Sequence, residues 1–486
     1  MITATKTETA PNDAAAEAVR AEEDKWLTEI AKVSAVLTRR FAGKLEKNYD
    51  LDRTLVSFQA NKSEGGHRWC KYKEGFSAAL IRYVIEKAGI SAGPILDPFA
   101  GSGTTLFVAS EHDLDAVGIE LLPSSAEIIE VRHLLTHCDV PQMAKGIRRF
   151  AAKRGWEQDG EVEKFQHLRI TDGAFPVETA KQLGRYLADT YKVKDTDLRR
   201  VLRFAAFCVL EKISYTRKDG QYLRWDHRSG RCLGKKVFDK GRIWEFTEAV
   251  TGKLAEIAQD ISGGGELFAC PAGKGKITLK VGSCLDIMPT LDAHSFAGLI
   301  TSPPYCNRYD YTRTYALELA MFGTGEDALK ALRQEMLSCT VENREKESLP
   351  QKSNTHLFEK AKTAFESQEL LTLILKYLDW CRESGTINNN GIPRMVLNYF
   401  RELTLVIFEC ARVLKRGAPM IMVNDNVRYQ GAIIPVDLIL SDIAQSAGFD
   451  VEAIWVLPVG KGNSSQQMGK HGREEIRKCV YVWRAK

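Results

Sequence analysis

Seven short apolar runs along the chain have the pattern of buried strands. Each is too short for a typical helix, and several end in glycine, proline or an acidic residue. The runs are GPILD (93–97), DAVGIEL (115–121), ITLKVGS (277–283), FAGLITS (296–302), APMIMVND (418–425), DVEAIWVLPV (450–459) and KCVYVWRA (478–485). Strand-length runs separated by longer segments predict an α/β fold with a mostly parallel sheet.

Between these runs, apolar residues recur at helical spacing. Helices are predicted over 25–48, 76–88, 105–112, 312–322, 356–382, 395–414 and 435–446. No helix separates the last two runs, so they cannot be joined by a parallel crossover. The sequence therefore predicts a seven-stranded sheet, parallel except for an antiparallel hairpin at its carboxyl-terminal end.

Two segments interrupt this alternation. Residues 136–275 lack the strand pattern, and residues 324–394 are long and polar for a simple connection, so we interpret both as insertions. The resulting division is a first domain part over 25–135, an insertion over 136–275, and a second part over 276–486 that contains the insertion 324–394. Residues 1–24, rich in Ala, Thr and acidic groups, are predicted to be a disordered tail.

Composition excludes several classes of protein. The chain has 486 residues, 44% of them hydrophobic and 27% charged, and no apolar run approaches the ~20 residues of a membrane span. Eleven cysteines lie scattered without a Cys-x-x-Cys pair, which argues against a zinc ribbon or a secreted disulfide framework. The nine histidines show no ligand spacing, so no metal is expected. These features predict a protein of the reducing cytoplasm, without a membrane partner.

Positive charge is concentrated in one segment of the first insertion. The range 199–242 holds thirteen Lys or Arg against four Asp or Glu, whereas the whole chain carries only +5. A basic patch interleaved with aromatic residues indicates a polyanion partner, although a solvated helix face gives the same composition.

The stretch DPFAGSGTT, residues 97–105, has the form of a ligand-binding turn. Gly101 and Gly103 allow the backbone to turn tightly after the strand and to approach a ligand closely. Asp97 at the strand end is placed to meet a cationic amino group. No Lys-Ser/Thr follows the glycines, which argues against a phosphate-binding Walker loop.

Two further acids follow neighbouring strands. Glu120 ends the second run, where one carboxylate can accept both hydroxyls of a ribose. Asp286 follows the third run and could accept from an adenine amino group. For each of these acids the alternative is a structural role at the start of a helix. This alternative is stronger for Asp286 than for Glu120.

The stretch TSPPY, residues 301–305, ends the fourth run abruptly. Pro303 and Pro304 remove two backbone donors, so strand pairing stops there and nearby carbonyl groups are free to face a ligand. Ser302 and these carbonyls could accept hydrogen bonds from an exocyclic amine, and Tyr305 offers a face for stacking a planar base. Acceptors that hold both N–H groups favour the localised lone pair that a base amine needs in order to attack a methyl group.

Together, DPFAGSG and the downstream TSPPY resemble the motifs of the DNA amino-methyltransferases, which transfer a methyl group from S-adenosylmethionine to a base nitrogen. The resemblance covers roughly 65–135 and 276–486. It implies a Rossmann-like class I methyltransferase fold and S-adenosylmethionine as cofactor. The positions it implies for the cofactor site are Phe76 over the methionine end, Asp97, Phe99, Gly101, Gly103 and Thr104 in the turn, Glu120 for the ribose and Asp286 for the adenine. The catalytic positions it implies are Ser302, Pro303, Pro304 and Tyr305.

The resemblance also bears on the target base. A Ser in the first position of the catalytic motif is more usual for cytosine-N4 enzymes, and Asp or Asn for adenine-N6 enzymes. Cytosine N4 is therefore the expected target, with adenine N6 as the first alternative. An RNA base methyltransferase, a protein-glutamine methyltransferase and a DNA-binding protein without activity remain further alternatives. A cytosine-C5 enzyme is disfavoured because Cys306 follows Tyr305 rather than a proline, and no nuclease motif is evident.

Target recognition is expected in the insertion 136–275, on the strength of its charge and aromatic residues. The residues expected to contact DNA are Arg217, Lys218, Arg224 and Arg228. In the family's familiar arrangements the recognition segment lies elsewhere, so the insertion 324–394 is a rival. The expected partners are double-stranded DNA, from which the target base is flipped out, and a cognate restriction endonuclease. The expected location is the cytoplasm of a prokaryote, at the nucleoid when bound to DNA.

Overall fold

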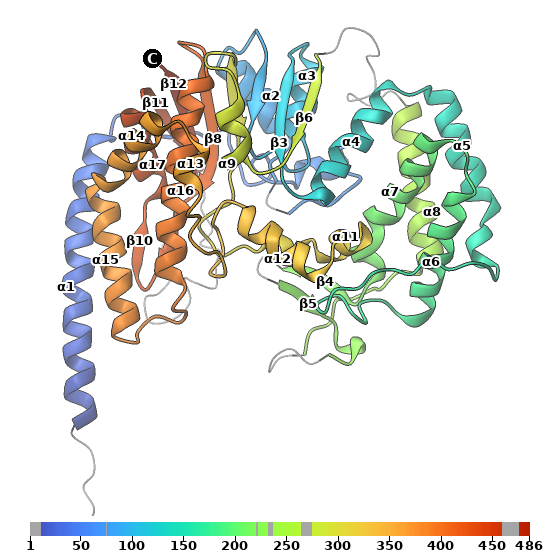
Figure 1. Cartoon of the computed structure of the whole chain (residues 1–486), viewed down its shortest axis with the longest axis horizontal. Helices are drawn as coiled ribbons and strands as arrows, with labels where there is room; N and C mark the ends of the chain where they lie inside the picture. Colours follow the sequence, from blue (N-terminus) through green and yellow to red (C-terminus); the bar gives the residue numbers. More distant parts are fainter. Residues whose placement is uncertain (1–10, 74, 220–221, 232–236, 264–274, 459–475) are drawn as a thin grey trace, which may run out of the picture.

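The fold is a mixed α/β structure around one large sheet (Figure 1). The computed structural model describes residues 11–73, 75–219, 222–231, 237–263, 275–458 and 476–486. The large sheet has eight strands in the order β1-β11-β12-β8-β7-β2-β3-β6. Their bounds are β1 Leu45–Lys47, β2 Ile95–Asp97, β3 Ala116–Glu120, β6 Ile277–Val281, β7 Gly298–Thr301, β8 Pro419–Asp425, β11 Phe449–Val456 and β12 Lys478–Ala485.

Helices cover both faces of the sheet and form the two insertions. The longer helices are α1 Pro11–Arg40, α2 Ala78–Lys87, α3 Thr104–Glu111, α4 Pro123–His137, α5 Val140–Lys153, α6 Val177–Tyr191, α7 Thr196–Ile213, α8 Phe246–Ser262, α12 Glu326–Glu335, α14 Thr355–Glu366, α15 Glu369–Glu383, α16 Ile392–Val413 and α17 Val436–Ala447. The shorter helices are α9 Cys284–Ile287, α10 Tyr311–Thr314, α11 Ala316–Met321 and α13 Leu349–Lys352. Two small hairpins pair β4 Thr216–Asp219 with β5 Tyr222–Trp225, and β9 Val427–Tyr429 with β10 Ala432–Ile434.

The strand directions confirm the predicted sheet. β12 runs antiparallel to both β11 and β8, and the other neighbouring pairs of the large sheet are parallel. All seven predicted strands are present. The eighth strand, β1, was not predicted, because its three residues LEK carry no apolar pattern and lie where a helix was expected.

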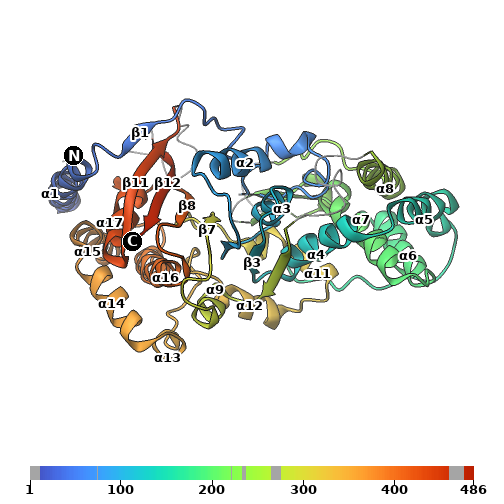
Figure 2. The same cartoon turned by 90° about the horizontal axis from the view of Figure 1, so that it is seen from above.

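Alternate residues of the strands face two different hydrophobic cores, as the period of two requires. Leu299, Met422 and Tyr481 pack with helices α15, α16 and α17 on one face. Their chain neighbours Ile300 and Val423 pack with α2 and α3 on the other face. The two helical layers are seen on either side of the sheet from above (Figure 2). A sheet that is buried on both faces explains the near-continuous apolar runs in the sequence.

The first insertion is helical and shares a core with the methyltransferase-like part of the chain. Helices α5 to α8 lie at the end of the molecule opposite α1 and α15 (Figures 1 and 2). The buried residues of this insertion, among them Trp156, Phe204 and Leu254, belong to one hydrophobic cluster. The same cluster contains Leu135 of α4 and Leu317 of α11. The segment is therefore anchored to the sheet domain by a common core.

The second insertion contributes helices to both ends of the molecule. Leu329 of α12 joins the core of the first insertion, whereas Leu371 and Ile374 of α15 join the core under α16 and α17. Helix α1 lies along α15, where the rings of Trp26 and Tyr377 are 6.3 Å apart.

The expectation of a disordered tail is wrong for residues 11–24, because α1 begins at Pro11. This part of the sequence is rich in Ala and Glu, which are strong helix formers. Glu23 is buried there, only 4% exposed, beside the α15 helix. Residues 1–10 lie outside the described residues. Within the described chain, no helix combines the length and apolar character needed to cross a membrane.

Candidate active site

Neighbouring parallel strands end side by side at one edge of the sheet, and predicted site residues stand at their ends. β2 ends at Asp97, β3 ends at Glu120, and β7 is followed directly by Ser302. Gly282 and Ser283 follow β6 at the same edge. Since ligands of open α/β sheets bind at the carboxyl ends of the strands, this edge is the candidate site. The fold thus brings together motifs that are two hundred residues apart in the sequence.

The glycine turn has the conformation predicted for it. Gly101 and Gly103 have φ values of +55° and +77°, which side chains rarely adopt. A Cβ atom on Gly103 would lie 2.8 Å from Cγ1 of Ile129, and one on Gly101 would lie 3.1 Å from the Tyr72 ring. Only glycine fits at both positions, so the turn stays close against its surroundings and leaves its outer side to a ligand.

Asp97 lies directly beneath this turn and is 1% exposed. Its Oδ1 accepts hydrogen bonds from Thr301 Oγ1 at 2.6 Å and from the Phe99 amide at 3.1 Å. Its Oδ2 is buried and has no hydrogen-bond donor among the described residues. Burial raises the pKa of this carboxyl to about 6, against the opposing effect of its hydrogen bonds. Asp97 therefore joins the end of β2 to the glycine turn and to the end of β7.

Glu120 faces the same turn from the end of β3. Its Oε2 accepts from the Gly101 amide at 2.7 Å and its Oε1 from the Leu122 amide at 2.8 Å. Burial raises the pKa of this carboxyl to about 7 despite these hydrogen bonds. Each carboxylate oxygen keeps a lone pair, so the group can still accept from two hydroxyls.

A pocket opens between the glycine turn and the strand ends, with an empty volume of about 770 Å³ that includes the solvent at its mouth. Five of the predicted cofactor residues line it: Phe76, Phe99, Gly101, Thr104 and Glu120. Asp97 and Gly103 support the turn from behind without lining it. Ser302 and Pro304 of the catalytic motif also line it. We call this space the donor pocket.

The donor pocket has the electrostatic character of a site for a neutral or cationic ligand. Glu120 is part of its wall, and none of the described residues that line it is Lys or Arg. A dinucleotide would bring an anionic pyrophosphate into the pocket without a countercharge, whereas a sulfonium or ammonium group is favoured by the acid and the aromatic rings.

The catalytic motif forms a corner just past β7. Ser302 Oγ lies 3.1 Å from the Val423 carbonyl oxygen of β8 and 3.2 Å from Tyr305 Oη. A hydroxyl has one proton, so when Ser302 donates to Val423 both of its own lone pairs are available to a ligand. Pro303 is buried, while Pro304 and Tyr305 are partly exposed.

A second pocket adjoins the first at this corner, with an empty volume of about 2,380 Å³. Ser302 lines both pockets, whereas Tyr305 lines only the second and Pro304 only the first. The second wall is basic. Its charged residues are Arg53, Lys62, Lys71, Lys73, Arg477 and Lys478, with Asp425 as the one carboxylate among the described lining residues. We call this space the acceptor pocket, and its charge indicates an anionic ligand.

Comparison with known proteins agrees with this geometry. The model of a family described as DNA methylase matches residues 3–131. The chain is 50% identical over 468 residues to the Type II methyltransferase M.AvaI of Nostoc sp. strain PCC 7120, covering 95% of each chain. The chain belongs to the Type II DNA methyltransferases of the N4/N6 family.

Other relatives agree with this assignment. The methyltransferase is 39% identical over 469 residues to the Type II methyltransferase M.BsoBI of Geobacillus stearothermophilus, covering 92% of this chain and 91% of the relative. A shorter likeness, 31% over 98 residues, links it to M.MjaII of Methanocaldococcus jannaschii, with 20% of this chain covered. The comparison with solved structures found no match. Family membership favours DNA over the RNA and protein substrates left open by the sequence.

Asp286 is not where the adenine prediction requires it in this methyltransferase. It lies in α9 with its side chain 43% exposed, and it forms an ion pair of 2.6 Å with Lys352. It does not line the donor pocket, whereas Gly282, Ser283 and Cys284 do. The prediction placed the acid correctly after β6, but in α9 its side chain pairs with Lys352 and does not join the pocket wall.

The sequence analysis missed residues that complete the donor pocket. Tyr72 lines both pockets, and its ring is stacked on Tyr315 at 5.1 Å. The other additional wall residues that matter most are Ser283, Cys284, Tyr311, Met336 and Leu337. Met336 and Leu337 follow α12 in the second insertion, and no motif in the sequence could have assigned them to a site.

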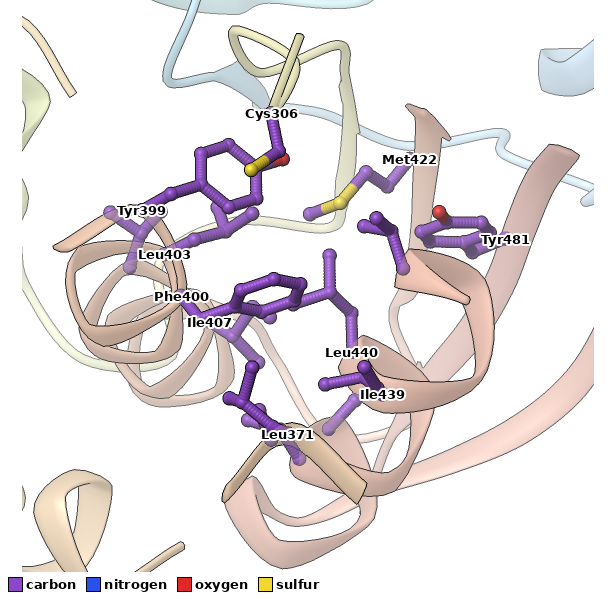
Figure 3. Close-up of a cluster of buried hydrophobic side chains, with 14 of the residues drawn as sticks. Cys306, Leu371, Tyr399, Phe400, Leu403, Ile407, Met422, Ile439, Leu440 and Tyr481 are labelled. Carbon is purple, nitrogen blue, oxygen red and sulfur yellow. The ribbon is translucent and has the colours of Figure 1, made fainter. Parts of the chain in front are cut away.

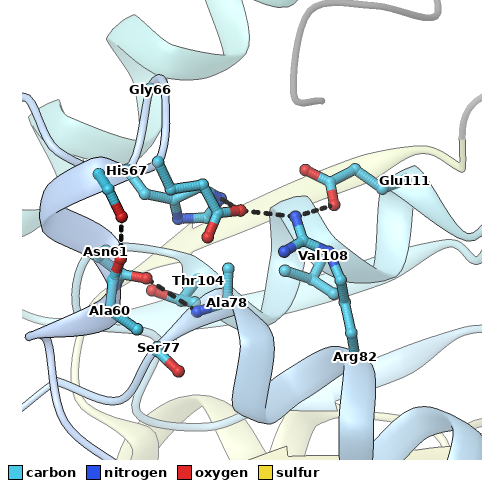
Figure 4. Close-up of polar contacts among 12 residues, drawn as sticks. Ala60, Asn61, Gly66, His67, Ser77, Ala78, Arg82, Thr104, Val108 and Glu111 are labelled. Carbon is cyan, nitrogen blue, oxygen red and sulfur yellow. Dashed lines mark hydrogen bonds and ion pairs between the residues drawn. The ribbon is translucent and has the colours of Figure 1, made fainter. Parts of the chain in front are cut away.

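Polar contacts hold Phe76, which lines both pockets, and Figure 4 shows the network around Asn61, Ala78 and Arg82. Asn61 Nδ2 donates to the Phe76 carbonyl oxygen at 3.2 Å, and Asn61 Oδ1 accepts from the Ala78 amide at 2.9 Å. In the same network Arg82 bridges Glu64 and Glu111. The start of α2 and the preceding loop are thereby held together as one unit.

Cys306 is a packed core residue, as predicted (Figure 3). Its side chain is 0% exposed and lies in the cluster with Tyr399 and Met422, and burial raises the pKa of its thiol well above the usual value. A buried neutral thiol is a poor nucleophile. The cytosine-C5 alternative therefore has no support in the structure.

The four predicted DNA-contact residues fall into different environments. Arg217 is exposed on β4, directly opposite the partly exposed Arg224 of β5. Arg224 lies 3.9 Å from Asp219 and over the Phe238 ring. Arg228 is held by Asp226 at 2.7 Å and by the Gly241 carbonyl oxygen at 2.6 Å, so its main contacts are within the loop.

Lys218 departs from the prediction, because its side chain is buried. Its Nζ forms an ion pair of 2.6 Å with Glu318 of α11 and lies 4.3 Å from the centre of the Tyr315 ring. Burial opposes its charge, yet Glu318 and Glu211 outweigh that effect and raise the pKa of the ammonium group. Strand alternation explains the error, since Arg217 and Lys218 point to opposite faces of the hairpin.

One group of side chains has the proximity of metal ligands. Among the described residues, Asp226, His227 and Asp239 place potential ligand atoms within 4.8 Å of one another. Asp226 is already bound by Arg228, and the Lys240 amide donates to it at 2.6 Å. Because the guanidinium neutralises this carboxylate, the cluster supports no metal assignment.

Proposed function

We propose that this methyltransferase methylates the exocyclic N4 of cytosine in double-stranded DNA. The observation that carries the proposal is the position of Ser302, which lines both the acidic donor pocket and the basic acceptor pocket. A methyl donor and a nucleotide bound in the two pockets would meet at this residue. Ser at this position supports cytosine, because it is the more usual residue of cytosine-N4 enzymes in the family.

The donor pocket fits S-adenosylmethionine on two counts. The Glu120 carboxylate can accept from both ribose hydroxyls, and the glycine turn, held from behind by Asp97, allows close approach. Phe76, Phe99 and Thr104 would complete the contacts. When bound, S-adenosylmethionine supplies an electrophilic methyl group on a sulfonium sulfur.

The residues of the corner prepare the amine of the target base. Ser302 Oγ, donating its proton to the Val423 carbonyl, accepts one N–H of the amine, and a backbone carbonyl beside Pro303 and Pro304 accepts the other. Both contacts hold the nitrogen lone pair out of conjugation with the ring. As the new N–C bond formed, the methyl–sulfur bond of the donor would break, and its electron pair would leave with the neutral thioether. The acceptors would stabilise the positive charge that develops on the nitrogen, which would then lose one proton to solvent.

The acceptor pocket provides the space for a flipped base. Tyr305 lines it beside Ser302, and its ring offers a stacking face at the corner. An amine paired inside a duplex cannot reach this corner, so the base must leave the helix stack.

The hairpin of β4 and β5 is proposed as a DNA contact of the first insertion. Arg217 and Arg224 lie directly opposite each other across the two strands. Like charges in this position destabilise a hairpin unless a counter-ion bridges them, and a DNA phosphate would serve. A cognate restriction endonuclease is a proposed partner, because the chain's relatives are Type II methyltransferases.

The affinity for S-adenosylmethionine is expected to rise with pH through about 7. The raised pKa of Glu120, about 7, means that the free protein holds a proton there at lower pH, and a neutral carboxyl is the weaker acceptor for ribose hydroxyls. The expected dissociation constant is about tenfold higher at pH 6 than at pH 8. Titration calorimetry across this range measures it.

The variant Glu120→Gln provides the control, with weaker binding and a flatter pH profile. Identical profiles for the variant and the wild type would contradict the assignment of Glu120. Folding stability changes in the opposite direction: a raised carboxyl pKa makes the folded state bind more protons than the unfolded state between pH 4.5 and about 7. Stability therefore falls as pH rises in this window, so the two effects can be separated.

The target base is tested by methylating plasmid DNA with the purified protein and isotope-labelled S-adenosylmethionine. After digestion to nucleosides, the label is expected in N4-methylcytosine. Label in N6-methyladenine would replace the cytosine assignment by the adenine alternative.

A further inference from the structure

We propose that a segment outside both insertions, residues 53–73, binds the DNA phosphates that flank the flipped nucleotide. The proposal rests on the proposed function and adds to it a second DNA contact beside the catalytic corner. Three cations of this segment carry it: Arg53, Lys62 and Lys73. All three line the acceptor pocket together with Ser302 and Tyr305.

These three cations differ from the other basic residues of the pocket in their partners. Lys71 pairs with Glu211 at 3.2 Å, Arg477 with Asp437 at 2.8 Å, and Lys478 with Asp425 at 2.6 Å. For the three cations of the segment, no ion pair is formed with any carboxylate in the described parts of the chain. Arg53 and Lys62 are exposed, and Lys73 is partly exposed.

The only described carboxylate in the pocket wall is therefore already neutralised. The three remaining positive charges surround a space that is large enough for a nucleotide, with Phe58, Tyr72, Phe76 and Tyr305 as aromatic faces. Positive charge along a groove together with aromatic faces is the pattern of nucleic-acid strand binding. The charge suits phosphate, and the aromatic faces suit a base.

Local contacts hold the segment in a fixed shape. Asp52 Oδ1 accepts from the Leu55 amide at 2.7 Å, and Ser57 Oγ donates to the Arg53 carbonyl oxygen at 2.7 Å. Asn61 ties the following turn to Phe76 and Ala78. The Lys73 amide donates to the Tyr315 hydroxyl at 2.8 Å. Cations on a fixed backbone lose less freedom on binding than cations on a mobile arm.

The arrangement gives the segment a defined task. Tyr72, near the end of the segment, and Phe76, just after it, line both pockets. Phosphate contacts at Arg53, Lys62 and Lys73 would hold the backbone of the target strand at the mouth of the acceptor pocket. The base between those phosphates would then be kept beside Ser302 for the reaction, independently of how the hairpin of β4 and β5 reads the site.

The test compares the variant Arg53→Gln/Lys62→Gln/Lys73→Gln with the wild type in DNA binding over a range of salt concentrations. Because each phosphate contact contributes about 0.9 to the slope of log K against log salt, the slope should become shallower by about two to three. At ~0.1 M salt the affinity for duplex DNA should fall about tenfold or more. Binding of S-adenosylmethionine should stay within about twofold, since none of the three residues lines the donor pocket.

A matched control removes three exposed cations of α1: Arg20→Gln/Lys32→Gln/Arg39→Gln. This control should keep the wild-type slope and affinity. An unchanged slope and affinity in the first variant, or an equal loss in the control, overturns the proposal. The double variant Arg53→Gln/Lys62→Gln gives the same decision if the triple variant does not fold.

The salt-dependence experiment and the test of the target base can fail independently of each other. If the wild type yields N6-methyladenine, the cytosine assignment fails while the salt dependence still decides the phosphate contacts. If the product is N4-methylcytosine and the slope is unchanged, the cytosine assignment stands and the phosphate contacts are rejected.

Discussion

Replacing Ser302 by alanine is expected to lower kcat for methyl transfer about a hundredfold, the effect of removing one hydrogen-bonding group aimed at developing charge. The variant loses the oxygen that we propose as the acceptor of an amine N–H, at the residue that lines both pockets. The Val423 carbonyl also loses its donor. The contacts of Asp97 and Glu120 remain, so the dissociation constant of S-adenosylmethionine should change by no more than about twofold. Single-turnover kinetics together with calorimetry separates the two quantities.

The neighbouring variant Cys306→Ala is the control for this experiment. Cys306 is buried in the core and touches neither pocket, so the variant should retain kcat at a modest cost in stability. Retained activity in Ser302→Ala would contradict the role of the corner. Loss of kcat in Cys306→Ala, with the fold intact, would instead revive a cysteine nucleophile.

Replacing Lys218 by methionine is expected to lower the free energy of unfolding by about 3–5 kcal/mol, because it leaves the Glu318 carboxylate buried without its partner. The side chains of this pair are only 6% and 5% exposed. Urea unfolding measures the loss. The double variant Lys218→Met/Glu318→Leu should recover most of it, since an apolar pair of similar size leaves no buried charge.

The same variant should also weaken binding in the donor pocket. Lys218 lies over the Tyr315 ring, Tyr315 is stacked on Tyr72, and Tyr72 lines the pocket beside Gly101. The exposed neighbour Arg217 is the stability control, and Arg217→Met should stay within about 0.5 kcal/mol of the wild type. Equal stability of Lys218→Met and Arg217→Met would contradict the structural role of the buried pair.

The large sheet could be predicted because its strands are buried on both faces. Leu299 and Ile300 pack into different cores, so the sequence shows an unbroken apolar run and not an alternating one. The short strand β1 could not be predicted, since Leu45 is the only apolar residue among its three. Its position depends on pairing with β11, a contact between parts of the chain four hundred residues apart.

The site could be predicted where backbone constraints select a residue type. Gly101 and Gly103 are required by positive φ, and the two prolines after Ser302 end a strand. Asp286 was placed wrongly, because its direction depends on the geometry of the α9 turn. Lys218 was misplaced for a reason visible in the sequence: within TRKD, alternation puts Lys218 on the same face as Thr216, which is buried.

The wall of the acceptor pocket could not be predicted from any motif. Arg53 lies in a turn and Lys62 in a short 3-10 helix, Ala60–Ser63. They line the same pocket as Arg477 and Lys478 only because the sheet places its last strand beside Ser302. Such a juxtaposition of distant segments leaves no local signal in the sequence. The basic wall is therefore a finding of the structure alone.

The central claim, that Ser302 presents cytosine N4 to the methyl donor, is tested most directly by nucleoside mass spectrometry. The DNA is taken from cells that express either the wild-type chain or Ser302→Ala. The account predicts N4-methylcytosine with the wild type and its near absence with the variant. N6-methyladenine with the wild type, or equal N4-methylcytosine from both, would contradict it.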